Sequence, residues 1–164
     1  MQIRGSLSPT AIASFLEEST VPVRLSCRTP ADHLWMCSLW YRLEETDAGA
    51  DSSDRDGWRL QCATSASADV VSFLEADPEV AFEVSTNDPP YAGVRGRGTA
   101  SIEPDPEKET LRTLLERYLD DTESGLAREL LRDERDEVVL TVEPAVVYGW
   151  DFSDRMGDGA ADSS

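Results

Sequence analysis

Short apolar segments, each bounded by turn residues, recur along most of the chain. Seven of them are rich in β-branched and aromatic residues, which is typical of β-strands. They cover residues 21–27, 34–43, 58–64, 80–85, 94–102, 138–142 and 145–150. Because helices are few and do not alternate with the strands, this pattern predicts a mainly β fold, an antiparallel barrel of six or seven strands.

The segment at residues 34–43 differs from the others because it is apolar at nearly every position. A strand of this kind is typically covered on both faces. We therefore expect one of its faces to lie on the core and the other to lie against a partner chain or a ligand.

Helical spacing of apolar residues predicts four short helices. The first begins near residue 9, and the other three cover residues 65–76, 107–119 and 126–131. The first has Ser8 as N-cap and Pro9 at its first position. The second is expected to be capped by Ser65 or Ser67 and to end before Pro78.

Two polar stretches accompany this pattern. Residues 46–57 are acidic and contain glycine, and we interpret them as a hairpin loop lengthened by a solvated insertion. Residues 156–164 consist mostly of Gly, Asp, Ala and Ser, which predicts a disordered acidic tail. With 164 residues the chain suits a single domain, which we place at residues 1–155.

Acidic residues dominate the charge of the chain. It has 33 acidic and 15 basic residues, a formal net charge of -18, and Lys108 as its single lysine. This composition indicates a halophilic protein of a salt-saturated cytoplasm, where the Debye length falls to roughly 3 Å and a self-repelling surface is tolerated. It argues against a nucleic-acid partner, because both molecules would be polyanions.

The cysteines and the histidine give no support for a metal site. Cys27, Cys37 and Cys62 lack C-x-x-C spacing, and His33 is the only histidine. We expect the thiols to be buried and reduced, as in a cytosolic protein. The N-terminus shows no signal sequence, and no apolar run approaches the ~20 residues that span a membrane.

Residues 86–100 form the strongest candidate for a binding site. In a strand, Arg95 and Arg97 would share one face, while Gly96 and Gly98 would leave the opposite face open to close approach of a ligand or of another backbone. Two forked cations beside an open face suit a planar, anionic ligand. The alternative is a bulged strand whose arginines pair with the surplus acid of the molecule.

Four segments, taken in order, resemble the pyridoxamine-phosphate-oxidase-like, flavin-binding split-barrel superfamily. They are the strand 34–41 with its terminal Trp-aromatic pair, Thr64 followed by a helix and the Asp-Pro-x-Val run 77–80, the Tyr-x-x-Val-Arg-x-x-Gly segment 91–98, and the closing strand 146–151. The resemblance extends from about residue 8 to residue 156. Together with the acidic composition, it suggests a haloarchaeal member of that superfamily.

The resemblance implies a homodimer with FMN, or in some branches a deazaflavin coenzyme or haem, in a groove between the protomers. The cofactor-binding residues that it implies, together with the two arginines, are Trp40, Tyr41, Thr64, Ser65, Ser67, Tyr91, Arg95, Arg97 and Trp150. Where the superfamily usually has a lysine in the phosphate-binding turn, this chain has Asp69. The missing cation would then be Arg95 or Arg97, or the partner's Arg24 or Arg42.

Each of these residues also has a structural interpretation. Trp40 and Tyr41 would stack on the ring or serve as core and interface aromatics, the serines would bind phosphate or cap a helix, and Trp150 would cover the ligand or pack beneath the tail. No carboxylate pair stands out as acid and base. Three functions stay open: a flavin-dependent oxidoreductase acting on a small molecule, a non-catalytic binding module, and a scaffold that has lost its cofactor.

Overall fold

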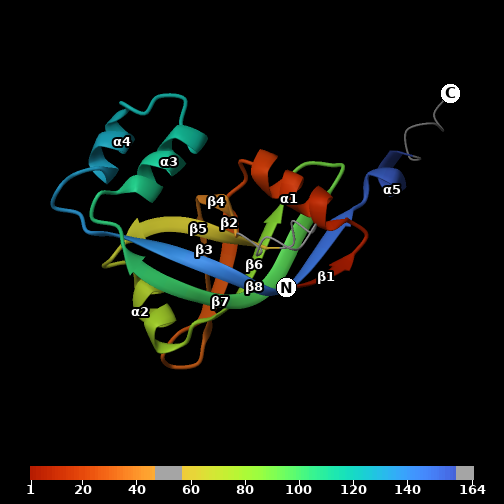
Figure 1. The fold of residues 1–164 in the computed structure, drawn as a ribbon, viewed down its shortest axis with the longest axis horizontal. Coiled ribbons are helices and arrows are strands. Elements are labelled where there is room, and N and C mark those ends of the chain that lie inside the picture. Colours follow the sequence, from red (N-terminus) through yellow and green to blue (C-terminus); the bar gives the residue numbers. More distant parts are fainter. Residues whose placement is uncertain (47–56, 158–164) are drawn as a thin grey trace.

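The computed structural model describes residues 1–46 and 57–157. A curved β-sheet of eight strands is the largest element of this part of the chain (Figure 1). Its strands are β1 (Gln2–Gly5), β2 (Val23–Arg28), β3 (Leu34–Leu39), β4 (Tyr41–Glu45), β5 (Trp58–Ser65), β6 (Glu79–Ser85), β7 (Ala92–Pro104) and β8 (Glu137–Asp151). The helices are α1 (Pro9–Glu18), α2 (Asp69–Ala76), α3 (Glu109–Tyr118), α4 (Gly125–Leu130) and α5 (Ser153–Gly157).

The strands follow the order β3-β2-β6-β7-β8-β5-β4, and every neighbouring pair in this series is antiparallel. This confirms the predicted mainly β, antiparallel class. Strand β1 adds a parallel pair on β8, which was not predicted because its four residues carry little pattern. Strands β3 and β4 stand at opposite ends of the order although only Trp40 separates them. The chain therefore closes the sheet into a barrel at this residue.

Two predicted strand boundaries were wrong. The segment 34–43 is divided at Trp40, where the chain passes from one edge of the sheet to the other. The predicted break at Pro144 does not occur, and one strand, β8, runs from residue 137 to 151. Gly98 pairs with Pro144 and Arg97 with Val146, so β8 has one extra residue, a bulge, at this point. The bulge accommodates the proline, which has no N–H to donate to the neighbouring strand.

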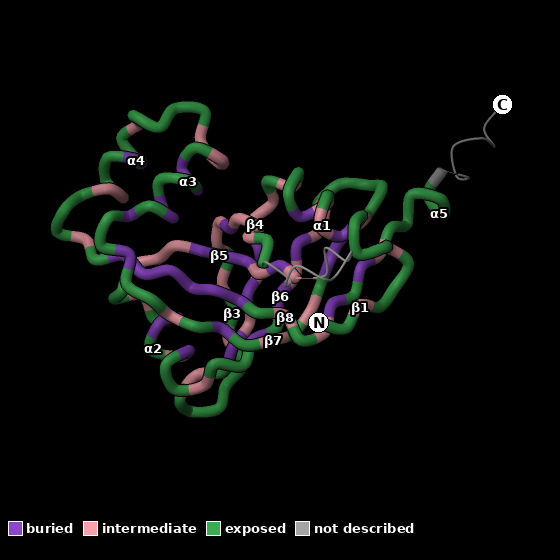
Figure 2. The backbone as a smooth tube through the Cα atoms, viewed as in Figure 1, coloured by how far each residue is buried: buried purple, intermediate pink, exposed green. Residues whose placement is uncertain are grey.

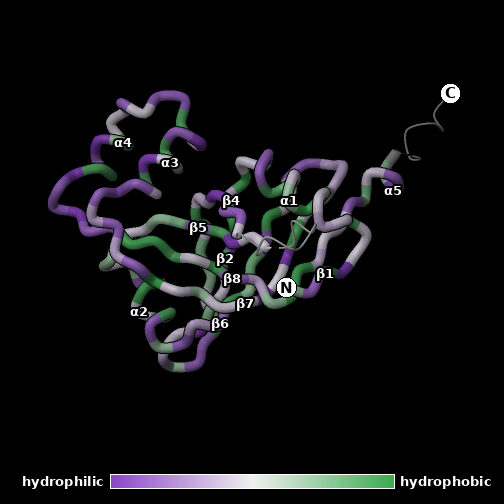
Figure 3. Tube along the Cα trace, viewed as in Figure 1, coloured by the Kyte–Doolittle hydropathy of each residue, from purple (hydrophilic) through white to green (hydrophobic). Residues whose placement is uncertain are grey.

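The core lies inside this curved sheet. Alternate residues of β2 and β6 point inward, among them Leu25, Phe82 and Val84, while helix α1 contributes Ile12 and Leu16. Figure 2 shows the buried positions along the central strands, and Figure 3 shows that the same strands carry most of the hydrophobic residues. The alternation read from the sequence therefore marks the inner face of the barrel.

Helices α3 and α4 hold a second apolar cluster. Leu111 and Leu115 of α3 and Ala127 of α4 are buried together and pack against Trp40 and Ala63. The apolar residues at helical spacing within 107–119 are thus confirmed as packing residues. Within the described residues, no helix has the length and apolar character needed to cross a membrane.

The ends of the predicted elements agree in part. Ser8 caps α1 as expected, and its Oγ accepts a hydrogen bond from the Ala11 N–H at 3.2 Å. A hydrogen bond of 2.8 Å between the Thr46 N–H and the Gly57 carbonyl closes the expected hairpin loop, whose residues 47–56 lie outside the described residues. Helix α5 includes the first two residues of the expected tail, and residues 158–164 also lie outside the described part.

Candidate functional site

A groove runs over the outer face of the sheet, across β3, β2, β6, β7 and β8. It has a volume of about 490 Å³ and an apolar floor that includes Met36, Ala81 and Val146. Its rim carries Arg24, Glu83, Arg95, Arg97 and Tyr148. The two arginines of β7 therefore share an exposed face, as the strand period predicted.

Cross-strand register explains how this face is built. Arg24 of β2 and Arg95 of β7 both pair with Glu83 of β6, and Arg95 also pairs with Tyr148 of β8. Two residues along, Arg97 lies between Ala81 and Val146. The cross-strand neighbours Arg24, Glu83 and Arg95 therefore alternate in charge. The guanidinium of Arg97, in contrast, lies between the apolar residues Ala81 and Val146.

Of the two partners predicted for the face of Gly96 and Gly98, a ligand or another backbone, the structure places backbone and core side chains there. A Cβ on Gly96 would lie 2.6 Å from Cζ of Phe82, which is a buried core residue, and 2.6 Å from the Val146 carbonyl oxygen. A Cβ on Gly98 would lie 2.0 Å from the Glu143 carbonyl oxygen, at the bulge. The missing side chains at these glycines leave room for Phe82 of the core and for the backbone of β8. A ligand can therefore bind only on the opposite, exposed face of β7, which carries Arg95 and Arg97 and is called the arginine face below.

Aromatic rings hold Arg95 in place. Its guanidinium carbon lies 5.2 Å from the ring centroid of Tyr148 and 5.2 Å from that of Trp150, which are cation–π distances. Trp150 also packs over Gly93, where a Cβ would come within 2.5 Å of its ring. Trp150 is therefore part of the wall of this face, and Tyr91, which is partly exposed, lies at the same end of β7.

The arginines of the groove do not pair with the surplus acid. Among residues 1–46 and 57–157, neither Arg95 nor Arg97 forms an ion pair. Arg24 donates to neutral partners, the Asn87 side chain at 2.9 Å and Ser85 Oγ at 3.4 Å. The guanidinium groups are thus positioned while their charge stays available to a ligand.

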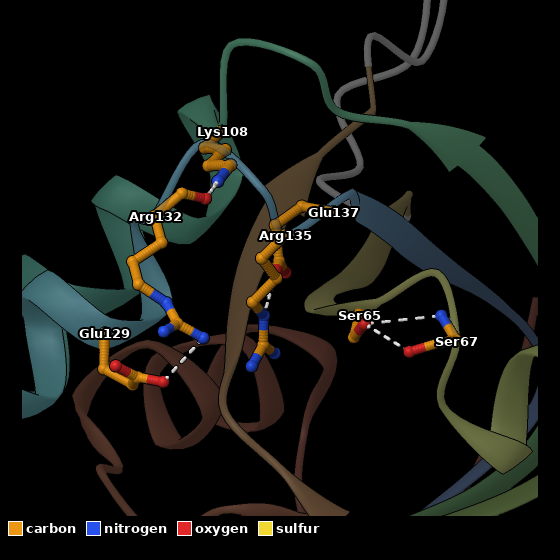
Figure 4. A network of polar contacts seen from close by, with 7 residues as sticks. All are labelled: Ser65, Ser67, Lys108, Glu129, Arg132, Arg135 and Glu137. Carbon is orange, nitrogen blue, oxygen red and sulfur yellow. Dashed lines mark hydrogen bonds and ion pairs between the residues drawn. The ribbon is translucent and has the colours of Figure 1, made fainter.

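The turn between β5 and α2, which was expected to bind phosphate, differs from the prediction in its helix cap. Helix α2 has Ala68 as N-cap without a side-chain hydrogen bond, so the predicted serine cap was wrong. Instead Ser65 Oγ lies 2.9 Å from Ser67 Oγ and accepts from the Ser67 N–H at 3.3 Å (Figure 4). Asp69 occupies the first turn and satisfies the helix dipole.

Cations near this turn are already engaged. Glu137, which pairs with Ser65 across β5 and β8, has a fully buried side chain and forms an ion pair with Arg135 (Figure 4). Lys108 is buried and donates to the Arg132 carbonyl oxygen. Thr64 precedes the turn on β5, opposite Val138. Lys108 and Arg135 are the basic residues that line the adjoining hollow within the described part of the chain, and both already have partners. The turn at Ser65 and Ser67 therefore has no free cation from this hollow.

Tyr41 has the structural role, and Trp40 packs on the second apolar cluster. Tyr41 is fully buried, and its hydroxyl donates to the Leu16 carbonyl oxygen at 2.8 Å. Burial raises the pKa of this hydroxyl, and nearby Tyr118 adds to the shift. Trp40 stacks on Tyr118 with ring centroids 5.3 Å apart. The expected stacking of Tyr41 on a ligand is incompatible with its place in the core.

Two residues of the candidate site remain to be placed, the predicted cation Arg42 and Tyr148, which the sequence interpretation did not include. Arg42 is bound to Gln61, whose Oε1 accepts from Nε at 2.8 Å and from Nη2 at 2.6 Å. The sequence interpretation missed Tyr148, which is partly exposed and holds Arg95. Its spacing of two from Trp150 was the available signal, because both then lie on one face of a strand.

Solved structures of similar fold were found, whereas no protein-family model and no curated protein matches the chain. A conserved hypothetical protein from Mycobacterium tuberculosis is 20% identical, with 97% of this chain and 93% of that one covered and a TM-score of 0.69. An F420 reductase is 22% identical over 80% of this chain and 92% of that one, with a TM-score of 0.58. A FAD-binding protein from Mesorhizobium loti is 19% identical over 86% and 92%, with a TM-score of 0.56.

The chain has the split-barrel fold. Within this split barrel, the residues fit the expected cofactors only in part. The exposed face of Arg95 and Arg97 fits a flat anion, because it combines an apolar floor with guanidinium groups that form no ion pair within residues 1–46 and 57–157. Within one protomer the turn at Ser65 and Ser67 does not fit a phosphate monoester, because Asp69 lies in the first turn and the nearby cations Lys108 and Arg135 are engaged; a phosphate there would need an arginine from a second copy.

Proposed function

We propose that this split-barrel protein binds a flavin-type redox cofactor and acts as an oxidoreductase on a small molecule. The observation that carries the proposal is the groove of 490 Å³ in which Arg95 and Arg97 lie unpaired, among described residues, above an apolar floor. An isoalloxazine ring is flat and aromatic with an apolar dimethylbenzene end, and the FMN side chain is anionic. FMN is the expected cofactor, with a deazaflavin coenzyme or haem as alternatives.

We further propose that the working unit is a homodimer. The turn at Ser65 lies beside Glu137 at the start of β8, whereas Arg95 lies beside Tyr148 near its end. Eleven residues of β-strand correspond to up to roughly 36 Å, longer than a flavin mononucleotide. A second copy would bring the arginine face of one protomer to the turn of the other. The exposed Leu34 and Met36 on β3 supply apolar surface for such a contact.

The cofactor would supply the hydride or electron transfer, and the chain would supply binding and orientation. Arg95, held between Tyr148 and Trp150, is fixed in direction before a ligand arrives, so little side-chain entropy is lost on binding. Arg97 would neutralise an anionic group, and the apolar floor would exclude water from the buried side of the ring. The proposed compartment is a salt-rich cytoplasm, in keeping with the charge of -18.

A second candidate is a binding module that holds such a cofactor for storage or sensing without turnover. Asp69 in the first turn of α2 favours it, because a carboxylate there would repel a phosphate and weaken or alter the use of FMN. Steady-state reduction of a substrate by the cofactor-loaded protein would contradict this candidate. The same measurement would support the oxidoreductase.

Both candidate functions require binding of a flavin-type cofactor, and an absorption spectrum tests this binding. The protein is purified in multimolar KCl, incubated with FMN or a deazaflavin, and desalted into the same buffer. We expect retained cofactor bands in the wild type and their loss in Arg97→Gln, with Arg112→Gln as a control on the exposed surface of α3. A featureless spectrum with every cofactor would leave the third possibility, a scaffold in which Arg95→Ala and Arg97→Ala alter only stability.

A further inference from the structure

The hollow that adjoins the turn between β5 and α2 differs in charge from the arginine face. It has a volume of about 290 Å³, and it lies where the end of β7, the turn before α3 and the start of β8 meet. Its apolar lining consists of Ala66, Pro104, Pro106 and Val138. Its charged lining consists of four carboxylates and two cations, Asp105, Asp133, Asp136, Glu137, Lys108 and Arg135. Because the carboxylates outnumber the cations, the hollow favours a positively charged occupant.

The two cations of the hollow leave part of this negative charge without a partner. Lys108 donates to a backbone carbonyl oxygen, and Arg135 pairs with Glu137 (Figure 4). Asp133 and Asp136 form no ion pair within the described part of the chain. Both are exposed, whereas Glu137 is buried, so they form the rim of the hollow and Glu137 lies deeper.

Glu137 is the most specific feature of the hollow. Its side chain has no exposed surface, and one carboxylate oxygen, Oε1, pairs with Arg135. The other oxygen, Oε2, is buried without a hydrogen-bond partner among the described residues. A buried carboxylate oxygen without a donor is costly, and native proteins provide a partner for nearly all such atoms. Because Glu137 lines the hollow, an occupant of the hollow is the available source of the missing donor.

The lining suits a primary ammonium group better than a metal ion. Within residues 1–46 and 57–157, no group of three or more Asp, Glu, His or Cys side chains could hold a metal ion. An ammonium group needs no such cage, because it has three N–H donors that can reach separate acceptors. Its methylene stem would lie along Ala66, Pro104 and Val138 and bury apolar surface there.

We propose that this hollow binds a small primary alkylammonium ion, whose –NH₃⁺ group donates a hydrogen bond to Oε2 of Glu137. Asp133 and Asp136 attract the cation to the rim, and the apolar lining holds its stem. The hollow shares no lining residue with the groove of the arginine face. The site is therefore a second binding site, and it does not depend on the proposed cofactor.

Isothermal titration calorimetry tests the inference, in the lowest KCl concentration that leaves the circular dichroism of the protein unchanged. The probe is butylammonium. Tetramethylammonium keeps the charge without an N–H donor, and butanol keeps the stem without the charge. We expect butylammonium to bind roughly tenfold or more tightly than either, because hydrogen bonds between charged groups are the strong ones.

Glu137→Gln should weaken butylammonium binding by roughly tenfold or more, because an amide oxygen carries no charge. Glu107→Gln is the matched control. It removes the same charge from the turn before α3, where Glu107 is exposed and does not line the hollow. This control should bind butylammonium as the wild type does.

Three outcomes would overturn the inference: no binding of butylammonium, equal binding of tetramethylammonium, or an unchanged affinity in Glu137→Gln. Circular dichroism verifies that each variant is folded. If Glu137→Gln does not fold, the double variant Asp133→Asn and Asp136→Asn replaces it, because both side chains are exposed. It should weaken binding roughly threefold or more, and an unchanged affinity would again overturn the inference. The cofactor proposal stands or falls separately, on the absorption spectrum.

Discussion

The substitution Gly96→Ala tests whether the inner side of β7 is filled by the core. The new Cβ would lie 2.6 Å from Phe82 Cζ and 2.6 Å from the Val146 carbonyl oxygen. Ordinary carbon contacts are about 3.5–4.0 Å, so the overlap with the ring is about 1 Å. The ring is buried and the carbonyl belongs to the neighbouring strand, so neither is free to withdraw.

Overpacking of this kind costs about 1–3 kcal/mol, against a gain of roughly 0.5–1 kcal/mol because alanine has less freedom than glycine in the unfolded chain. A net loss near 1–2 kcal/mol should lower the urea midpoint by about 0.5–1 M at an m-value of roughly 2 kcal/mol/M. The assay is urea unfolding in constant KCl, followed by tryptophan fluorescence.

Gly125→Ala is the matched control, because Gly125 begins α4 and a Cβ there would meet no atom within 4 Å. It should leave the midpoint unchanged or raise it slightly, since alanine is the better helix former. An unchanged midpoint for Gly96→Ala would refute the packing account. The inner side of β7 would then have room for a ligand.

Two further predictions concern the buried hydroxyl of Tyr41 and the partly buried thiol of Cys37. Tyr41→Phe removes the hydroxyl that donates to the Leu16 carbonyl oxygen, and we expect a loss of about 1 kcal/mol in urea unfolding with no change in ligand affinity; a change in affinity alone would restore Tyr41 to the site. Burial, with a smaller effect of Cys27, raises the pKa of Cys37 from 9.0 to about 11. The folded state then holds a proton that the unfolded state releases, so stability present below pH 9 should decline towards pH 11. Alkylation of Cys37 by iodoacetamide, read by mass spectrometry, should rise over the same window, and full alkylation at pH 8 would contradict this.

The alternation of apolar residues was sufficient to predict most strands and the barrel class. It failed at Trp40 and Pro144, because a corner and a bulge depend on which strands pair. Pro144 is tolerated since Gly98, far away in sequence, accommodates the extra residue opposite. No local pattern contains that information.

For the candidate site, the period of two correctly placed Arg95 and Arg97 on one exposed face. The sequence left open whether a ligand or another backbone approaches Gly96, because it does not show that Phe82 lies opposite this residue. Tyr41 was assigned to the ligand by resemblance, although its hydroxyl has a backbone partner on α1. Cross-strand neighbours, which decide what each face contacts, became available only with the structure.

Strand β8 also determines when the barrel can assemble during synthesis. It lies between β7 and β5, so the strands made earlier form two separate sheets until residues 137–151 have left the ribosome. Residues 2–5 are among the first to be made, yet they pair with residues 146–149 and must wait for them. Contacts so distant in sequence slow folding, and the open sheet edges are meanwhile exposed to other chains. A dense negative charge on the nascent chain would keep such chains apart during this interval.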